Sequence, residues 1–79
     1  MVADALEHLV RGIVDHPDDV TVTVKKSHRL EILQVRVHPD DLGRVIGRGG
    51  RTARALRTVI NSIAPGGKVR VDVVDVDRR

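Results

Sequence analysis

The residues best suited to chemistry in this 79-residue chain form one short segment, Gly47-Arg48-Gly49-Gly50. Glycine has no Cβ atom, so its main chain adopts positive φ angles readily and can approach a phosphate group closely. A helix is expected directly after this segment, and the start of a helix presents unpaired N–H groups and a positive dipole end to an anion. The side chain of Arg48 adds a positive charge at the same place. The segment therefore predicts a phosphate-binding loop.

Positive charge is concentrated around this loop. The stretch from Leu42 to Val71 contains seven basic residues and no acidic residue, although the net charge of the whole chain is only +3. The remainder of the chain is therefore net acidic. A cationic segment of this kind favours a polyanionic partner. Its basic residues are Arg44, Arg48, Arg51, Arg54, Arg57, Lys68 and Arg70.

Two helices are predicted to hold the loop in position. Pro39 suits a first helical turn, and the Asp40-Asp41 pair after it complements the positive end of a helix. The apolar residues within 42–46 provide the buried face of this first helix. Apolar residues also recur at helical spacing over 52–64 and predict the second helix, which the Pro-Gly-Gly sequence at 65–67 ends. The loop thus lies between two helices.

The remaining segments predict one more helix and three strands. Apolar residues at spacings of three and four predict a helix over about 1–14. Valines alternate with polar residues over 20–24 and again over 69–73, which is typical of half-buried strands. Another strand is expected over 30–37, but its alternation slips by one residue near Leu33. We therefore expect a bulge or a change of face at that position.

The resulting order of elements is helix, strand, strand, helix, helix, strand, or αββααβ. It predicts an α+β fold of two layers, in which three helices cover one face of a three-stranded sheet. The length favours one domain over residues 1–79, with a core of about 20–76 and an additional N-terminal helix of about 1–14. We expect the second and third strands to be parallel neighbours, joined by a right-handed two-helix crossover.

The loop and the order of elements together resemble those of a known family. The segment Val45-Ile46-Gly47-Arg48-Gly49-Gly50 resembles the I-G-x-x-G hallmark of KH domains, and the element order resembles the type II arrangement of that family. The residues Asp41 to Gly47 and Gly50 to Ala53 are similar to those of small bacterial KH proteins of the KhpA type. The resemblance covers essentially the whole chain. Arg48 replaces a lysine that is often found in the loop, which preserves the charge but alters its geometry.

The resemblance implies that the loop clamps the backbone of single-stranded RNA. Bases are then expected beside the loop, in a groove lined by the first of these helices and the adjoining strand. Ile46 and Val45 are the apolar candidates for contact with them, and the alternative for both is a place in the core. Arg51 and Arg54 on the second helix are placed to reach phosphates, and Arg44 adds charge from the first. The expected RNA-binding residues are Gly47, Arg48, Gly49, Gly50, Ile46, Arg51, Arg44 and Arg54.

Other functional classes fit the sequence less well. The absence of aromatic residues excludes aromatic base-stacking platforms, and the absence of cysteine excludes disulfides and thiolate metal sites. The loop lacks the Gly-Lys-Ser/Thr ending of a nucleotide-binding P-loop and follows a helix instead of a strand. Neither serine lies in a nucleophile motif, and the four histidines show no i, i+4 pairing. The sequence therefore predicts no enzyme, cofactor or metal site.

The resemblance also bears on partners and location. It implies a cytoplasmic bacterial RNA chaperone or post-transcriptional regulator that forms a homodimer or pairs with a larger KH-containing, KhpB-like protein. No apolar run approaches the roughly 18–20 residues of a membrane span, so no membrane association is expected. An alternative interpretation is a protein–protein dimerisation module whose RNA binding is weak or depends on a KH partner.

Overall fold

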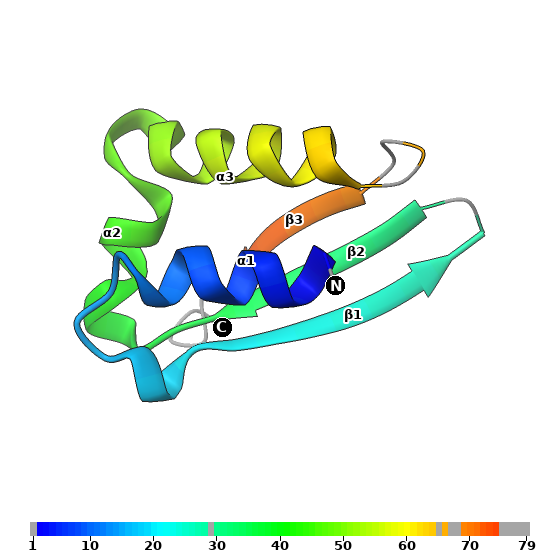
Figure 1. Ribbon diagram of the computed structural model, residues 1–79. Coiled ribbons are helices and arrows are strands. Elements are labelled where there is room, and N and C mark those ends of the chain that lie inside the picture. The colour runs from blue at the N-terminus through cyan, green and yellow to red at the C-terminus, as the bar shows by residue number, and fades with distance from the viewer. Residues whose placement is uncertain (1, 29, 65, 67–68, 75–79) are drawn as a thin grey trace.

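The computed structural model describes residues 2–28, 30–64, 66 and 69–74. The predicted bounds that fall on residues 1, 65, 67–68 and 75–79, including Lys68 of the basic stretch, lie outside the described residues. The order of helices and strands agrees with the prediction (Figure 1). The elements are α1 (Val2–Arg11), η1 (Pro17–Asp19), β1 (Thr21–Ser27), β2 (Leu30–Arg36), η2 (Pro39–Asp41), α2 (Leu42–Ile46), η3 (Arg48–Gly50), α3 (Arg51–Ile63) and β3 (Val69–Val74), where η marks a 3-10 helix.

The three strands form one sheet in the order β1-β2-β3. β1 and β2 are antiparallel, whereas β2 and β3 are parallel, as expected. The predicted bulge at Leu33 is wrong, because the register between β1 and β2 runs without interruption and pairs Leu33 with Val24. Leu33 and Val35 are the buried residues of β2, while Leu30 is exposed on the other side of the strand. The backbone of β2 is therefore regular, and its apolar residues change face, from Leu30 and Ile32 on one side to Leu33 and Val35 on the other.

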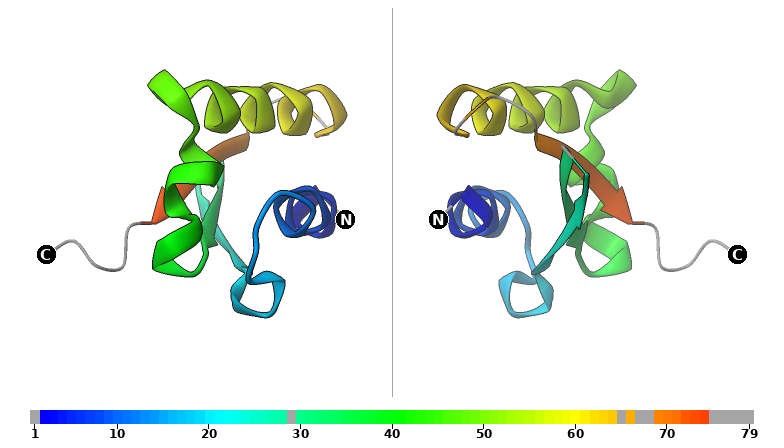
Figure 2. Two further views of the ribbon diagram at one scale, coloured as in Figure 1. Left: turned by 90° about the vertical axis from the view of Figure 1, so that its left-hand side faces the viewer. Right: turned by 90° about the vertical axis from the view of Figure 1, so that its right-hand side faces the viewer.

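Helices α1 and α3 pack against the sheet. α1 contacts β1 and α3, while α3 contacts β3, and the end-on views show how these two helices surround one side of the twisted sheet (Figure 2). The short helix α2 packs against α3 near the end of the sheet where β2 finishes (Figure 1). Three helices and a three-stranded sheet confirm the predicted α+β class.

The core contains only aliphatic side chains. Most of its residues come from positions where the helical or strand alternation points toward the contact between helices and sheet, while Val20, Val37 and Ala64 lie just outside the helices and strands. Val45 is fully buried in this core and so anchors α2 on the side that faces the rest of the domain. The buried apolar residues are Leu6, Val10, Val20, Leu33, Val35, Val37, Val45, Leu56, Ile60, Ala64, Val69 and Val71.

Asp41 is the one charged side chain that is buried within the described part of the chain, with an exposed fraction of 1%. Its Oδ1 accepts a hydrogen bond from the main-chain N–H of Asp15 at 3.1 Å. Its Oδ2 accepts the main-chain N–H of His16 at 2.9 Å and lies 2.9 Å from Nδ1 of the same residue. The carboxylate thus joins the segment after α1 to the start of α2.

These contacts change the ionisation of both partners. Burial opposes ionisation of the Asp41 carboxyl, but the hydrogen bonds from Asp15 and His16 outweigh it and hold the pKa of Asp41 below its ordinary value of 3.8. The same side-chain hydrogen bond raises the pKa of His16 above 6.5, against a smaller opposing effect of desolvation. The buried carboxylate is therefore kept in its charged, acceptor-only form.

The glycines between α2 and α3 meet two different constraints. Gly47 ends α2 with a φ of 78°, and a Cβ atom at this position would lie 2.7 Å from the main-chain nitrogen of Thr52. Gly49 and Gly50 also have positive φ angles, of 64° and 77°, but a Cβ atom at either position would meet no atom within 4 Å. Gly47 is therefore required by close packing as well as by its backbone angle, whereas Gly49 and Gly50 are required only by the angle.

We predict that Asp41→Asn lowers the melting temperature by about 5 °C or more, because one acceptor oxygen is replaced by an amide that faces N–H donors. Asp40→Asn makes the same chemical change on the adjacent side chain, which is 78% exposed, and should leave the melting temperature nearly unchanged. Thermal unfolding followed by circular dichroism measures both. Equal losses in the two variants would contradict the anchoring role of Asp41.

A second prediction separates the loop glycines. Gly49→Ala should lower the free energy of unfolding by about 1–2 kcal/mol, which is the cost of a left-handed angle for a residue with a Cβ atom. Gly47→Ala should lower it by at least about 3 kcal/mol, because the new methyl group also collides with Thr52. Urea unfolding of both variants gives these values. The steric argument fails if Gly47→Ala is no less stable than Gly49→Ala.

Candidate nucleic-acid interface

The loop predicted to bind phosphate connects α2 directly to the start of α3. The main-chain N–H of Gly50 donates to the carbonyl oxygen of Gly47 at 3.1 Å, which closes the turn η3. The next residue, Arg51, begins α3, and Gly50 has no side chain that could cap the first N–H groups of this helix. The side chain of Arg48 is exposed on the turn. The main-chain N–H groups of Gly47, Gly50 and Arg51 already donate to the carbonyl oxygens of Gly43, Gly47 and Arg48. What the loop offers an anion is therefore the positive end of a 13-residue helix and the exposed cation of Arg48.

The predicted arginines do not share one environment. Arg51 and Arg54 are exposed one turn apart at the start of α3, next to the loop. Arg44 is also exposed on α2, but its Nη2 lies 3.1 Å from Oδ2 of Asp15, so part of its charge is neutralised. The positive charge that is available at the loop comes mainly from Arg48, Arg51 and Arg54.

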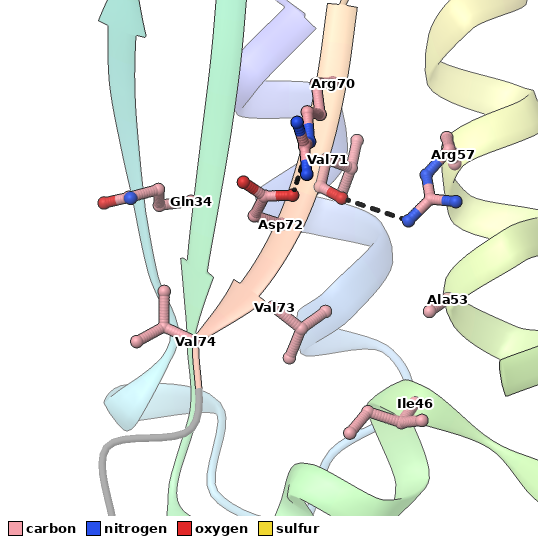
Figure 3. Close-up of a pocket in the computed structure, with 9 residues that line it drawn as sticks. All are labelled: Gln34, Ile46, Ala53, Arg57, Arg70, Val71, Asp72, Val73 and Val74. Carbon is pink, nitrogen blue, oxygen red and sulfur yellow. Dashed lines mark hydrogen bonds and ion pairs between the residues drawn. The ribbon is translucent and has the colours of Figure 1, made fainter. Parts of the chain in front are cut away.

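A groove of about 470 Å³ lies between β3 and the helices beside the loop (Figure 3). Ile46, at the end of α2, is 38% exposed and lines this groove, whereas Val45, the other apolar candidate, is fully buried in the core and does not line it. The lining also includes apolar residues from α3 and β3, together with a polar rim. The lining residues are Gln34, Ile46, Ala53, Arg57, Arg70, Val71, Asp72, Val73 and Val74.

Two contacts order the polar rim. Nη2 of Arg57 donates to the carbonyl oxygen of Val71 at 3.4 Å, which links α3 to β3 across the groove (Figure 3). Nε of Arg70 lies 3.0 Å from Oδ1 of Asp72, and this ion pair moderates the charge of the rim. Because β3 is an edge strand of the described sheet, the main-chain groups on its open side are available to a ligand. The groove thus offers apolar contact together with hydrogen-bond donors and acceptors.

Sequence reasoning did not identify most of the groove. The basic stretch includes Arg57 and Arg70, but the predicted site does not. No sequence pattern singles out Gln34 or Asp72. One sequence signal does indicate where the groove lies. The expected parallel pairing of the second and third strands places β3 at the edge of the sheet, beside the crossover helices. The strand residues that line the groove follow from that placement.

The geometry separates two chemical tasks. The loop provides the positive end of α3 and arginines for phosphates, which carry no base identity. The groove is bordered by Ile46 and Val73 and by polar side chains, so it suits flat, partly apolar groups with hydrogen-bonding edges. In addition, no helix within the described ranges has the length and hydropathy required to cross a bilayer.

Comparisons with known proteins identify the family. The family model described as KhpA/KhpB, KH domain, matches residues 3–76. The chain is 67% identical over 75 residues to the RNA-binding protein KhpA of Leifsonia xyli subsp. xyli, which covers 95% of this chain and 99% of that protein. It is 66% identical over 77 residues to the RNA-binding protein KhpA of Streptomyces coelicolor, with 98% and 96% covered.

A third relative is the RNA-binding protein KhpA of Mycobacterium bovis, which is 63% identical over 78 residues, with 99% of this chain and 96% of that protein covered. A comparison with solved structures gave no match. The family model and these relatives extend over nearly the full chain, and the αββααβ order of the structure is consistent with a KH fold. The chain therefore belongs to the KhpA/KhpB family of KH domains.

Proposed function

We propose that this protein binds single-stranded RNA, with the phosphate backbone on the Gly47–Gly50 loop and the bases in the groove beside β3. The observation that carries this proposal is the position of the loop, which joins the positive end of α3 to a groove with both apolar and polar lining. The relatives described above carry the name RNA-binding protein, which agrees with a nucleic-acid ligand.

The proposed path of the RNA assigns a role to each predicted residue. Phosphates contact the main chain of the loop and the side chain of Arg48, while Arg51 and Arg54 extend the positive surface along α3. Bases turn into the groove, where Ile46 contacts their faces. A KH loop of this kind engages about four nucleotides. Arg44 contributes less to phosphate binding, because its ion pair with Asp15 neutralises part of its charge.

The shape of the site favours a single strand over a duplex. Bases in a duplex are stacked and paired, so their faces and hydrogen-bonding edges are not free to enter a groove of about 470 Å³. Since the chain has no aromatic residue to stack on the bases, we expect weak binding with little sequence preference. Such binding suits an RNA chaperone or post-transcriptional regulator in the bacterial cytoplasm, acting without enzymatic activity and with a KhpB-like partner.

The variant Arg48→Asp/Gly49→Asp tests the placement of the RNA. It should weaken the binding of labelled single-stranded RNA by at least about tenfold, because two carboxylates then face the phosphates. Aspartate tolerates positive φ angles better than most residues, so the loop should keep its shape. Fluorescence anisotropy measures the affinity, and circular dichroism confirms that the variant is folded.

The matched control is Lys25→Glu/Lys26→Gln, which changes the net charge equally on the exposed β1 strand. It should leave the RNA affinity within about twofold of the wild type, apart from long-range electrostatics. The wild-type affinity should also fall with salt, with a log–log slope of roughly −0.7 for each phosphate contacted. The proposed site is wrong if the control variant loses more affinity than the loop variant.

We further propose that the protein forms a homodimer through the exposed flank of α3 that carries Val59 and Ile63. Val59 and Ile63 are 45% and 52% exposed and lie one turn apart on this helix. At 100° per residue they lie about 120° around the helix axis from Ala53 and Arg57, which line the groove. A second copy that covers Val59 and Ile63 would therefore leave the RNA groove open. This arrangement is the observation that favours the dimerisation alternative as an addition to RNA binding.

Ile63→Asp tests this dimer, because it places a charge in the apolar contact. The variant should shift the protein toward monomer by at least about tenfold in dissociation constant, as measured by analytical ultracentrifugation. Thr23→Asp adds the same charge on the exposed face of β1 and should leave self-association unchanged. RNA affinity per chain should be similar in both variants. A monomeric wild type would refute the dimer but not the RNA site.

A further inference from the structure

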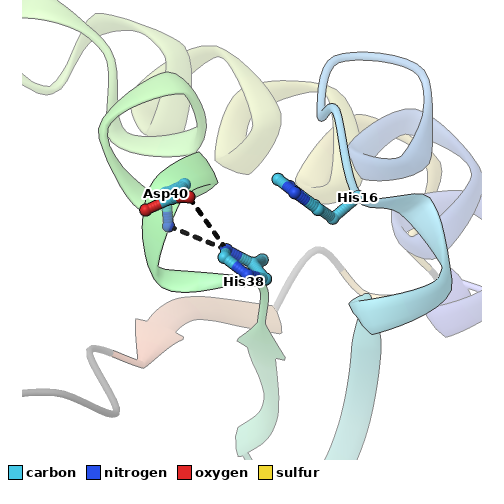
Figure 4. A group of neighbouring side chains, drawn as sticks. All are labelled: His16, His38 and Asp40. Carbon is cyan, nitrogen blue, oxygen red and sulfur yellow. Dashed lines mark hydrogen bonds and ion pairs between the residues drawn. The ribbon is translucent and has the colours of Figure 1, made fainter.

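Two histidines that are distant in the sequence lie face to face where η1 and η2 begin. The ring of His16 stacks on the ring of His38 with centroids 3.9 Å apart and an angle of 13° between the planes. Asp40, in η2, lies beside His38, with its Oδ2 3.8 Å from Nδ1 of that ring (Figure 4). His16, His38 and Asp40 each have one metal-binding atom within 4.8 Å of the others. None of the three contributes to the groove or to the phosphate-binding loop.

The contacts of His16 fix the atom that is free to bind a ligand. Its Nδ1 lies 2.9 Å from Oδ2 of Asp41, which also accepts the main-chain N–H of His16. An ionised carboxylate can only accept hydrogen bonds, so Nδ1 carries the proton and the neutral ring has its lone pair on Nε2. A histidine held by a carboxylate in this way is the usual arrangement behind a metal-bound imidazole.

The contacts of His38 leave a different nitrogen available. Its Nδ1 accepts the main-chain N–H of Asp40 at 3.0 Å, so the lone pair of this ring is on Nδ1. A cation at about 2.0–2.2 Å from both Nδ1 of His38 and Oδ2 of Asp40 can span the 3.8 Å between them. Binding then replaces the N–H contact at Nδ1. Because the Asp40 side chain is 78% exposed, it is free to turn toward such an ion.

We propose that His16, His38 and Asp40 form a zinc-binding site. Two imidazole nitrogens and one carboxylate oxygen are a ligand set that Zn²⁺ binds with a water molecule in the fourth position. Tetrahedral coordination needs ligand atoms about 3.4 Å apart, and one ligand atom of each side chain lies within 4.8 Å of the others, so the three side chains must move closer together. The stacked rings must also tilt toward each other. Zn²⁺ tolerates a distorted arrangement of these ligands, because its d-electrons impose no geometric preference.

The position of the site in the fold predicts how a bound ion affects stability. His16 belongs to the segment after α1, whereas His38 and Asp40 belong to the segment that leads from β2 into α2. The described part of the chain already joins these segments through Asp41. A bound zinc ion adds a second link beside that carboxylate, and because it binds only the folded arrangement, it stabilises the fold by mass action.

Isothermal titration calorimetry with ZnCl₂ at about pH 7.5 tests the proposal, because zinc binds neutral histidine and protons compete less at this pH than in acid. We expect one zinc ion per chain and a rise in melting temperature at saturation. NMR should show that zinc shifts the imidazole signals of His16 and His38 but not those of His8 and His28. MgCl₂ should give no comparable binding, because Mg²⁺ prefers oxygen ligands.

Two variants keep the test independent of folding defects. His38→Ala should weaken zinc binding at least about tenfold, and Asp40→Asn should also weaken it while it preserves the size and main-chain contacts of Asp40. His8→Ala removes a histidine on α1 and should leave the affinity unchanged. The proposal is overturned if the wild type binds no zinc, if Mg²⁺ binds as tightly, or if His38→Ala and His8→Ala have equal affinity. None of these results bears on RNA binding.

Discussion

The paired carboxylate of Asp41 is the contact on which the position of the loop depends. A buried charge is costly unless donors surround it, so Asp41 draws the main-chain N–H groups of Asp15 and His16 against the start of α2. Helix α2 has only five residues and is too short to be stable alone. Its direction is set by Asp41 before its first residue and by Val45 in the core. These contacts of α2 therefore also set the position of the loop that follows it.

Helix α3 then distributes its residues among three environments. Leu56 and Ile60 enter the core, Ala53 and Arg57 line the groove, and Val59 and Ile63 remain exposed. A helix of 13 residues can do this because successive residues turn by 100°, which separates the three sets around its axis. The proposed RNA contact and the proposed dimer contact therefore use different faces of one rigid element, and neither requires a change in the core.

Local patterns explain which parts of the fold were predictable from the sequence. The helices beside the loop and strand β3 have clear periodicity and strong end signals, so their order and approximate bounds were predicted. The error at Leu33 arose because β2 carries apolar residues on both faces, which hides the phase of its alternation. The groove residues Arg57 and Asp72, and the stacked histidines, come together only through tertiary packing. No spacing rule applied to the sequence reveals such contacts.

The charged groups on and directly before α2 differ in burial, and this difference bears on the proposed position of the phosphates. At the start, the Asp41 carboxylate is buried and saturated with donors, whereas the ion pair between Arg44 and Asp15 is exposed. Exposed pairs of this type contribute only about 0–1 kcal/mol, so a phosphate can compete with Asp15 for Arg44 at little cost. The competition still reduces what Arg44 can add. Arg48 has no such competitor among the described contacts, which favours the loop as the position of the proposed phosphate contact.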